Sequence, residues 1–146
     1  MEKRIQIDQV APNGYKSMYA IEKYLGESDL NPTHKELIKM NASYINGCAF
    51  CIDMHSKDAI KNGETAQRLL LISAWRETDV FTEEEKLILE ITEEITLIHQ
   101  QGLTKETYKK ALATFGEKYL ANIILAITAI NMWNRIAVST HKPLLK

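Results

Sequence analysis

Two cysteines and a histidine lie within eight positions of the sequence, in the segment INGCAFCIDMHSKD (residues 45–58). Cys51 follows Cys48 by three residues, and His55 follows Cys51 by four. On a helix this spacing places all three side chains on one face. Two thiols three residues apart can reach disulfide distance with modest adjustment, and the histidine can exchange a proton with the nearer thiol. The spacing therefore predicts one thiol that reacts and a second that closes a disulfide.

The expected start of this helix bears on which thiol ionises more easily. Cys48 follows Gly47 and falls in the first turn, where free backbone N–H groups and the helix dipole favour an anion. On these grounds Cys48 has the lower thiol pKa. The sequence alone leaves open which cysteine attacks first.

A Cys-x-x-Cys pair can also attach haem, bind zinc or belong to a thioredoxin-type motif, and this chain suits none of these well. Covalent haem attachment needs a histidine directly after the second cysteine, and Ile52 stands there. A structural zinc site commonly uses two cysteine pairs, and this chain has two cysteines in all. A thioredoxin-type motif belongs in a βαβ pattern, whereas the surrounding sequence is helical. The remaining alternative is that both cysteines are small buried apolar residues without chemistry.

A carboxylate upstream of the pair admits two interpretations. Glu36 precedes Cys48 by twelve positions, on the preceding expected helix. Residues 33–36 have the spacing of a capping box, which would turn Glu36 back onto the start of its own helix. Alternatively, a partly buried Glu36 beside the thiols would have a raised pKa and could shuttle protons to His55 or to a water near neutral pH.

The elements that must position these residues are helices, because apolar residues recur at helical spacing almost everywhere and no segment alternates as a strand does. Helix starts are marked by Asn31 before Pro32 and by a capping box from Thr82 to Glu85. The last helix is apolar on nearly all sides, as expected of a helix buried centrally or in a subunit interface. We expect a single all-α domain over residues 1–146, with about six or seven helices. The expected helices are residues 15–28, 31–46, 48–62, 64–75, 82–101, 104–115 and 117–138.

Several other polar and aromatic residues are expected to have structural places. Trp75 and Trp133 are predicted to pack in the core or in an interface. Asn131 lies in an apolar helix and needs a partner if it is buried; it could line a pocket or satisfy a neighbouring group. The histidines outside the motif are expected at the surface or the terminus, and the acidic residues of 82–101 on a solvated face. These residues are His34, His99 and His141, and Glu83, Glu84, Glu85, Glu93 and Glu94.

The composition of the 146-residue chain narrows the classes of function. Hydrophobic residues make up 45% and charged residues 25%, with a net charge of −1. There is no basic excess to neutralise a nucleic-acid backbone, and no apolar run approaches the roughly 20 residues needed to span a bilayer. The start, MEKRIQIDQV, lacks the features of a secretory signal, so we expect a cytoplasmic protein. In a reducing compartment a cysteine pair is more often redox-active or metal-binding than a permanent staple.

The arrangement of Glu36, Cys48, Cys51 and His55, separated by eleven, two and three residues, resembles the signature of the alkylhydroperoxidase D (AhpD) family of the carboxymuconolactone decarboxylase superfamily. The similarity extends to VAPNGYKSMYAIEKYL, ASYINGCAFCIDMHSKDAIKNGETAQRLLLISAWRET and LAITAINMWNRIAVS, and so covers almost the whole chain. It implies an all-helical fold that assembles into trimers or hexamers. It also implies peroxidase or disulfide-reductase chemistry in antioxidant defence, with no metal and no cofactor.

The resemblance also implies a role for each residue of the motif. Cys51 would attack the peroxide and Cys48 would resolve the product as a disulfide, while His55 and Glu36 relay protons. An external dithiol, carried by a lipoyl or thioredoxin-like protein, would then reduce the disulfide by exchange. Some family members carry a second histidine between the cysteines, where this chain has Phe50.

Three other functions stay open at this point. The same cysteine pair could serve a non-catalytic redox partner or sensor, or could be inert in a structural protein. The superfamily also contains carboxymuconolactone decarboxylases, which are lyases that do not use a cysteine pair. The presence of Cys48 and Cys51 therefore argues against the lyase, although the fold would permit it.

Overall fold

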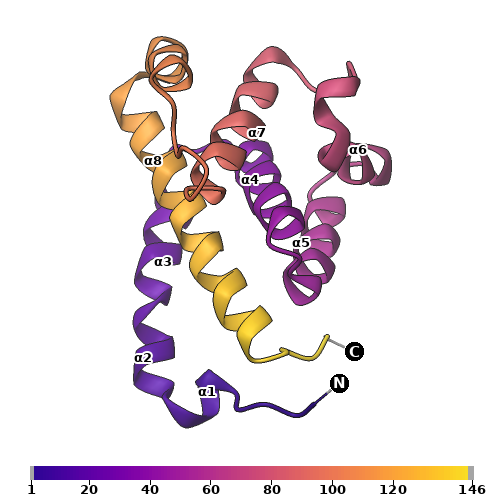
Figure 1. Cartoon of the computed structure of the whole chain (residues 1–146), viewed down its shortest axis with the longest axis vertical. Coiled ribbons are helices and arrows are strands. Elements are labelled where there is room, and N and C mark those ends of the chain that lie inside the picture. Colours follow the sequence, from indigo (N-terminus) through magenta and orange to yellow (C-terminus); the bar gives the residue numbers. More distant parts are fainter. Residues whose placement is uncertain (1, 145–146) are drawn as a thin grey trace.

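The computed structural model describes residues 2–144, and all regular secondary structure in that range is helical (Figure 1). The predicted all-α fold is confirmed. Every expected helical segment is helical, but three differ from the prediction: residues 15–28 are divided at Met18, residues 64–75 form an α-helix followed by a 3-10 helix, and the helix expected over 82–101 ends at Thr96. A short helix, residues 7–10, precedes them. The elements are α1 (Ile7–Val10), α2 (Pro12–Ser17), α3 (Tyr19–Glu27), α4 (Pro32–Ile45), α5 (Ala49–Lys61), α6 (Ala66–Leu71), the 3-10 helix η1 (Ile72–Glu77), α7 (Glu83–Thr96) and α8 (Lys105–Ser139).

The C-terminal element α8 contains the two helices that the sequence predicts separately. The break between them is at Gly116, whose φ of 75° and ψ of 168° are not helical. Glycine adopts this positive φ at little cost because it has no Cβ. The expected division of residues 104–138 into two helices at this glycine is therefore confirmed.

The length and composition of α8 also correct one expectation. Within the described residues, α8 includes an 18-residue window with a mean hydropathy of 1.3, which is long and apolar enough for a membrane span by those two criteria. Half of that window is buried against the rest of the domain. A buried core helix meets the same criteria, so the finding is weak evidence for a span.

Helix α4 is central, and seven of its fourteen residues are buried. It packs against α5, α7 and α8, and α7 also packs against α8. Leu37, Ile38 and Met40 of α4 are at most 1% exposed, and they meet Ile88 of α7 and Ile127 of α8 in one core cluster. The segment that holds the two cysteines and His55 follows directly from the C-terminal end of this packed helix.

The junction between α4 and α5 is a glycine-dependent turn. Gly47 has a φ of 63°, and its N–H donates to the carbonyl of Tyr44 at 3.2 Å. The N–H of Cys48 donates to the carbonyl of Ser43 at 3.0 Å. This pair of bonds around a left-handed residue is the Schellman motif that ends many helices. It makes Cys48 both the last residue of this turn and the N-cap of α5.

Four polar side chains, buried or half-buried, attach this junction to α8. The amide of Asn46 donates to Oδ1 of Asn131 at 3.0 Å and to Oδ1 of Asn134 at 2.9 Å. Asn134 in turn donates to Oγ of Ser43 at 3.1 Å. Asn131 therefore satisfies neighbouring polar groups and does not line the large cavity beside α5. Buried amides of this kind are stable only when their hydrogen bonds are made, so the network fixes the α4–α5 junction against α8.

Helices α2 and α3 lie beside α8, while α1 lies near the C-terminal end of α8, where both ends of the chain are also found (Figure 1). The indole N–H of Trp133 donates to Oε1 of Glu22 at 2.8 Å. Tyr15 and Tyr19 contact the ring of Trp133, with centroids 5.2 and 5.5 Å away. Aromatic contacts of this geometry add to the burial of apolar area, so this cluster fastens α2 and α3 to α8.

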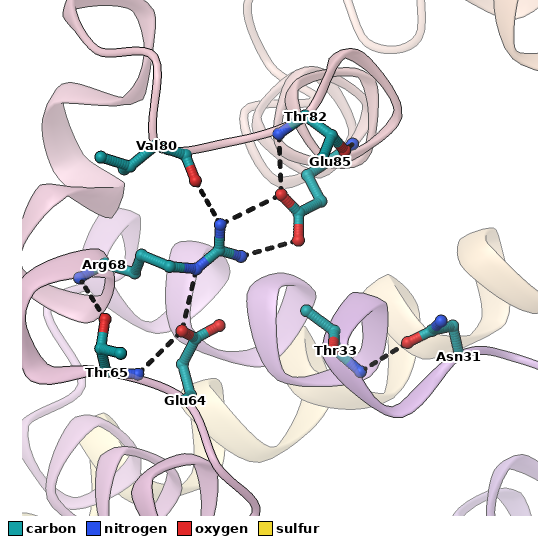
Figure 2. Close-up of polar contacts among 8 residues, drawn as sticks. All are labelled: Asn31, Thr33, Glu64, Thr65, Arg68, Val80, Thr82 and Glu85. Carbon is teal, nitrogen blue, oxygen red and sulfur yellow. Dashed lines mark hydrogen bonds and ion pairs between the residues drawn. The ribbon is translucent and has the colours of Figure 1, made fainter.

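Two expectations about surface residues are wrong. His34 is buried, 8% exposed, and its Nδ1 lies 2.8 Å from the hydroxyl of Tyr119. Glu85 is also buried, because it pairs with Arg68 at 2.7 Å while accepting from the N–H of Thr82 at 2.8 Å (Figure 2). Its capping-box role with Thr82 is confirmed. The pairing partner comes from α6, and sequence spacing within one helix does not show a partner from another element.

Candidate active site

The two cysteines form a disulfide between the N-cap and the first turn of α5. Their Cα atoms are 5.3 Å apart, and Cys48 and Cys51 are 1% and 2% exposed. They pack together with Ala137 of α8 and the partly buried ring of Phe50. The geometric expectation that residues three apart on a helix can be bridged is confirmed.

The environments of the two sulfurs differ. The N–H of Cys51 donates to Sγ of Cys48 at 3.3 Å, as it would to the side chain of any N-cap residue. Cys51 lines a cavity of about 490 Å³, and Cys48 does not. The helix N-terminus thus favours negative charge on Cys48, whereas only Cys51 is open to a molecule in the cavity.

His55 lies one turn further along α5 and lines the same cavity as Cys51. It is 8% exposed, and its Nδ1 has no hydrogen-bond partner among the described residues. Burial lowers the pKa of His55 from 6.5 to about 4, and the positive charge of Lys39 acts in the same direction. The imidazole is therefore neutral near pH 7 and can accept a proton from a thiol.

Glu36 does not cap α4. The N-cap of that helix is Asn31, whose Oδ1 accepts from the N–H of Thr33 at 2.8 Å (Figure 2). The capping-box interpretation of residues 33–36 is therefore wrong. Oε1 of Glu36 lies 3.6 Å from Nζ of Lys39, and Oε2 is buried without a partner among the described residues. Burial raises the pKa of Glu36, with Lys39 opposing the shift, as expected of a carboxyl that could hold a proton.

Glu36 faces a different cavity from the one that holds Cys51. This second cavity has a volume of about 280 Å³ and a polar lining that includes Glu64, Arg68 and Glu85. Arg68 anchors this lining because it pairs with both carboxylates and donates to the carbonyl of Val80 (Figure 2). The four predicted residues are therefore divided between two cavities. Cys51 and His55 line the large one, with Cys48 joined to Cys51 by the disulfide, and Glu36 of α4 lines the second.

The large cavity is an apolar chamber between α3, α5 and α8, with a volume of about 490 Å³. This lies within the roughly 300–1,000 Å³ typical of small-molecule sites. Cys51 and His55 are the candidate reactive residues in its lining, and its charged lining residues are Glu22, Lys35, Lys39 and Lys142. The aromatic and aliphatic lining residues are Tyr15, Tyr19, Leu25, Phe50, Met54, Ala126, Ala129, Ile130, Trp133, Ile136 and Ala137.

Lys39 and the aromatic walls of this chamber were not predicted from the sequence. Lys39 could have been found, because it follows Glu36 by three residues and so shares its helix face. Tyr15 and Tyr19 could not, since they reach the site only through the packing of α2 and α3 on α8. Trp133 packs against the core, as expected, and also lines the chamber.

Comparison with known proteins shows which family the chain belongs to. The sequence profile of the carboxymuconolactone decarboxylase family matches residues 12–94, more than half of the chain and all four motif residues. The chain belongs to this family, and its motif and fold make it an AhpD-like member.

Individual relatives extend the match over the full length. YdfG of Bacillus subtilis (strain 168), an uncharacterized protein, is 44% identical over 139 residues, which is 95% of both chains. YnjA of Escherichia coli (strain K12), also uncharacterized, is 25% identical over 118 residues, covering 77% of this chain and 62% of YnjA. A crystal structure of ATU0492 from Agrobacterium tumefaciens superposes with a TM-score of 0.95 at 37% identity and covers 99% of both chains. That protein is described as of unknown function and assigned provisionally to antioxidant defence as AhpD.

Proposed function

We propose that this protein is a cofactor-free thiol peroxidase and disulfide reductase that reduces alkyl hydroperoxides. The observation that carries the proposal is the position of Cys51: it lies within disulfide reach of Cys48 and opens, beside a neutral His55, into a mainly apolar chamber. An apolar chamber of this size suits a hydroperoxide with a sizeable hydrocarbon body. The provisional antioxidant assignment of ATU0492 agrees with this function.

The first chemical step is the ionisation of Cys51. His55 accepts the thiol proton, and the thiolate attacks the terminal oxygen of the hydroperoxide. The S–O bond forms as the O–O bond breaks, and the alkoxide takes a proton to leave as an alcohol. The sulfur is oxidised by two electrons to a sulfenic acid, and the peroxide is reduced by two.

The second step closes the disulfide. The thiol of Cys48 condenses with the sulfenic acid of Cys51, and water leaves. Cys48 is suited to this role because it is buried against Cys51 and outside the chamber. An external dithiol of a lipoyl or thioredoxin-like protein then exchanges with the disulfide, becomes oxidised and restores both thiols. Glu36, with its raised pKa, would return protons to His55 from the polar cavity behind it.

We also propose that the protein works as a homo-oligomer, a trimer or a hexamer, in the cytoplasm. This assembly is what the resemblance to the AhpD family implies, and Leu125 and Val138 of α8, 37% and 43% exposed, are candidates for its interface. A cytoplasmic location suits the cycle, because reducing conditions there regenerate the dithiol donor.

The test counts free thiols by mass spectrometry after the reduced protein is mixed with one equivalent of cumene hydroperoxide, and again after dihydrolipoamide is added. We expect rapid loss of two thiols, a Cys48–Cys51 disulfide, and recovery with the dithiol. Oxidation without catalytic turnover in the presence of a reductant would favour a redox partner or sensor. Thiols that do not react with the peroxide would contradict the proposal and return the lyase and structural alternatives to consideration.

A further inference from the structure

A thiolate at Cys51 would stand in surroundings that disfavour charge. Cys51 is 2% exposed, and most of the chamber lining around it is apolar. Burying an anion without a nearby positive charge is costly and raises the pKa of a thiol. His55 does not supply that charge near pH 7, because its pKa of about 4 leaves the imidazole neutral.

Two of the three lysines that line the chamber have close polar partners other than Cys51. Nζ of Lys35 donates to the carbonyl of Leu25 at 2.6 Å, and Nζ of Lys142 pairs with Asp8 at 3.0 Å. The carboxylate Glu22, which also lines the chamber, accepts from the indole of Trp133. Each charged group that lines the chamber from α3, from the start of α4 or from the C-terminal segment therefore has a polar partner.

The third lysine, Lys39, has a more distant ion-pair partner. Its ion-pair partner is Glu36 at 3.6 Å, beyond ordinary hydrogen-bond length. Burial raises the pKa of that carboxyl, which favours its neutral form. Lys39 lines the chamber together with Cys51 and His55, and its charge helps to lower the pKa of His55. The field of Lys39 therefore reaches the reactive end of the chamber.

We propose that the ammonium group of Lys39 is the cation that stabilises the thiolate of Cys51. His55 relays the thiol proton and returns to its neutral form, so the negative charge left on sulfur interacts with Lys39 across the chamber. Lys39 itself keeps its proton and forms no covalent bond. The inference rests on the proposed role of Cys51 as the attacking thiol, and it extends the motif by one residue from the preceding helix.

The experiment measures the pKa of the Cys51 thiol from the pH dependence of iodoacetamide alkylation, in a Cys48→Ser background with one thiol. Lys39→Met is expected to raise the thiol pKa by roughly one unit, the effect of removing a unit charge in a partly desolvated site. Alkylation at pH 7 should then slow by up to about tenfold. Lys39→Arg should keep the rate near that of the parent, because the charge is retained.

The matched control is Lys57→Met, which removes an exposed lysine of α5 that pairs with Asp53 and does not line the chamber. It should leave the alkylation profile unchanged. A second measurement follows the His55 ring by NMR, where Lys39→Met should raise the imidazole pKa above its low value. An unchanged thiol pKa in Lys39→Met, or an equal shift in Lys57→Met, would overturn the proposal. If Lys39→Met does not fold, Lys39→Gln provides the same comparison.

This test is independent of peroxide. Alkylation reports the charge around Cys51 whether or not a hydroperoxide is the substrate. A shifted thiol pKa in a protein that ignores peroxide would support the role of Lys39 and contradict the peroxidase function. Normal peroxide turnover with an unshifted thiol pKa would support the peroxidase function and contradict the role of Lys39.

Discussion

The N–H of Cys51 donates a hydrogen bond of 3.3 Å to the sulfur of Cys48, although both sulfurs also form one disulfide. The contact places Cys48 at the N-cap of α5 and Cys51 in the first turn, facing the chamber. The helix start therefore stabilises charge on one thiol, while access and the neighbouring His55 favour attack by the other. This asymmetry underlies the different roles proposed for the two cysteines.

The roles of the two thiols can be separated by single substitutions. Cys51→Ser is expected to abolish peroxide consumption, because the remaining thiol of Cys48 does not line the chamber. Cys48→Ser should still lose one thiol to one equivalent of peroxide, and should stop at a sulfenic acid that a carbon nucleophile traps for mass spectrometry. Full activity in Cys51→Ser would show that the assigned nucleophile is wrong.

Buried His55 should make the protein less stable in mild acid. Its folded-state pKa of about 4 is below the value of 6.5 expected when it is unfolded. The unfolded state therefore binds more protons between these values, and the stabilisation present above pH 6.5 is lost as the pH falls towards 4. The loss should be up to about 3 kcal/mol, measured by urea denaturation at pH 7 and pH 4.5.

His55→Asn is the control for this pH dependence. The variant should lose less unfolding free energy than the parent over the same pH interval. The pKa of His34 is also lowered by burial, but His34 is present in both proteins and cancels in the comparison. Equal losses in parent and variant would show that His55 is not buried in its neutral form.

A side chain at Gly47, in the turn before the motif, should destabilise the protein. Its φ of 63° is unfavourable for any residue with a Cβ, although no atom lies within 4 Å of an added Cβ. Gly47→Ala is therefore expected to lower the free energy of unfolding by about 1–2 kcal/mol through backbone strain alone. Gly14→Ala, at an exposed helical position with the same open space, should not be destabilising. Chemical denaturation of the two variants makes the comparison, and equal stabilities would contradict the strain argument.

The amide network at the junction should contribute to stability. Asn134→Ala removes the group that accepts from Asn46 and donates to Ser43, so each of these neighbours loses a hydrogen-bond partner. The expected loss is about 1–3 kcal/mol, measured by urea denaturation of the reduced protein. Thr128→Ala changes an exposed hydroxyl of the same helix, which bonds only to the carbonyl of Ile124, and should have little effect. A similar small effect in Asn134→Ala would mean that the network is dispensable.

The solution mass provides a test of assembly. Sedimentation equilibrium should give a particle of three or six chains of 16.7 kDa each. Replacing the exposed apolar Val138 with Lys should weaken this assembly if α8 is part of the interface, whereas Ile60→Lys on the exposed side of α5 serves as a comparison. A monomer of the unmodified chain would contradict the proposed oligomer.

Features that depend on near neighbours along the chain could be predicted from the amino-acid sequence. Helical periodicity, the capping box of Thr82 and Glu85, and the break at Gly116 all follow from local backbone preferences. The shared face of Cys48, Cys51 and His55 follows from the helix repeat, because residues three and four apart are neighbours on its surface. Local geometry therefore predicted the grouping of these three residues, the core of the proposed site.

The surroundings of that core depend on how the helices pack, and they emerged only from the three-dimensional fold. Glu36 was ambiguous from spacing because its alternatives, a helix cap and a buried carboxyl, differ in packing between helices. Burial of Glu85 depends on Arg68 from another helix, and the chamber wall of Tyr15 and Trp133 depends on α2 lying against α8. Burial, cavity shape and the resulting pKa of His55 come from residues distant in sequence, and periodicity within one helix contains no information about them.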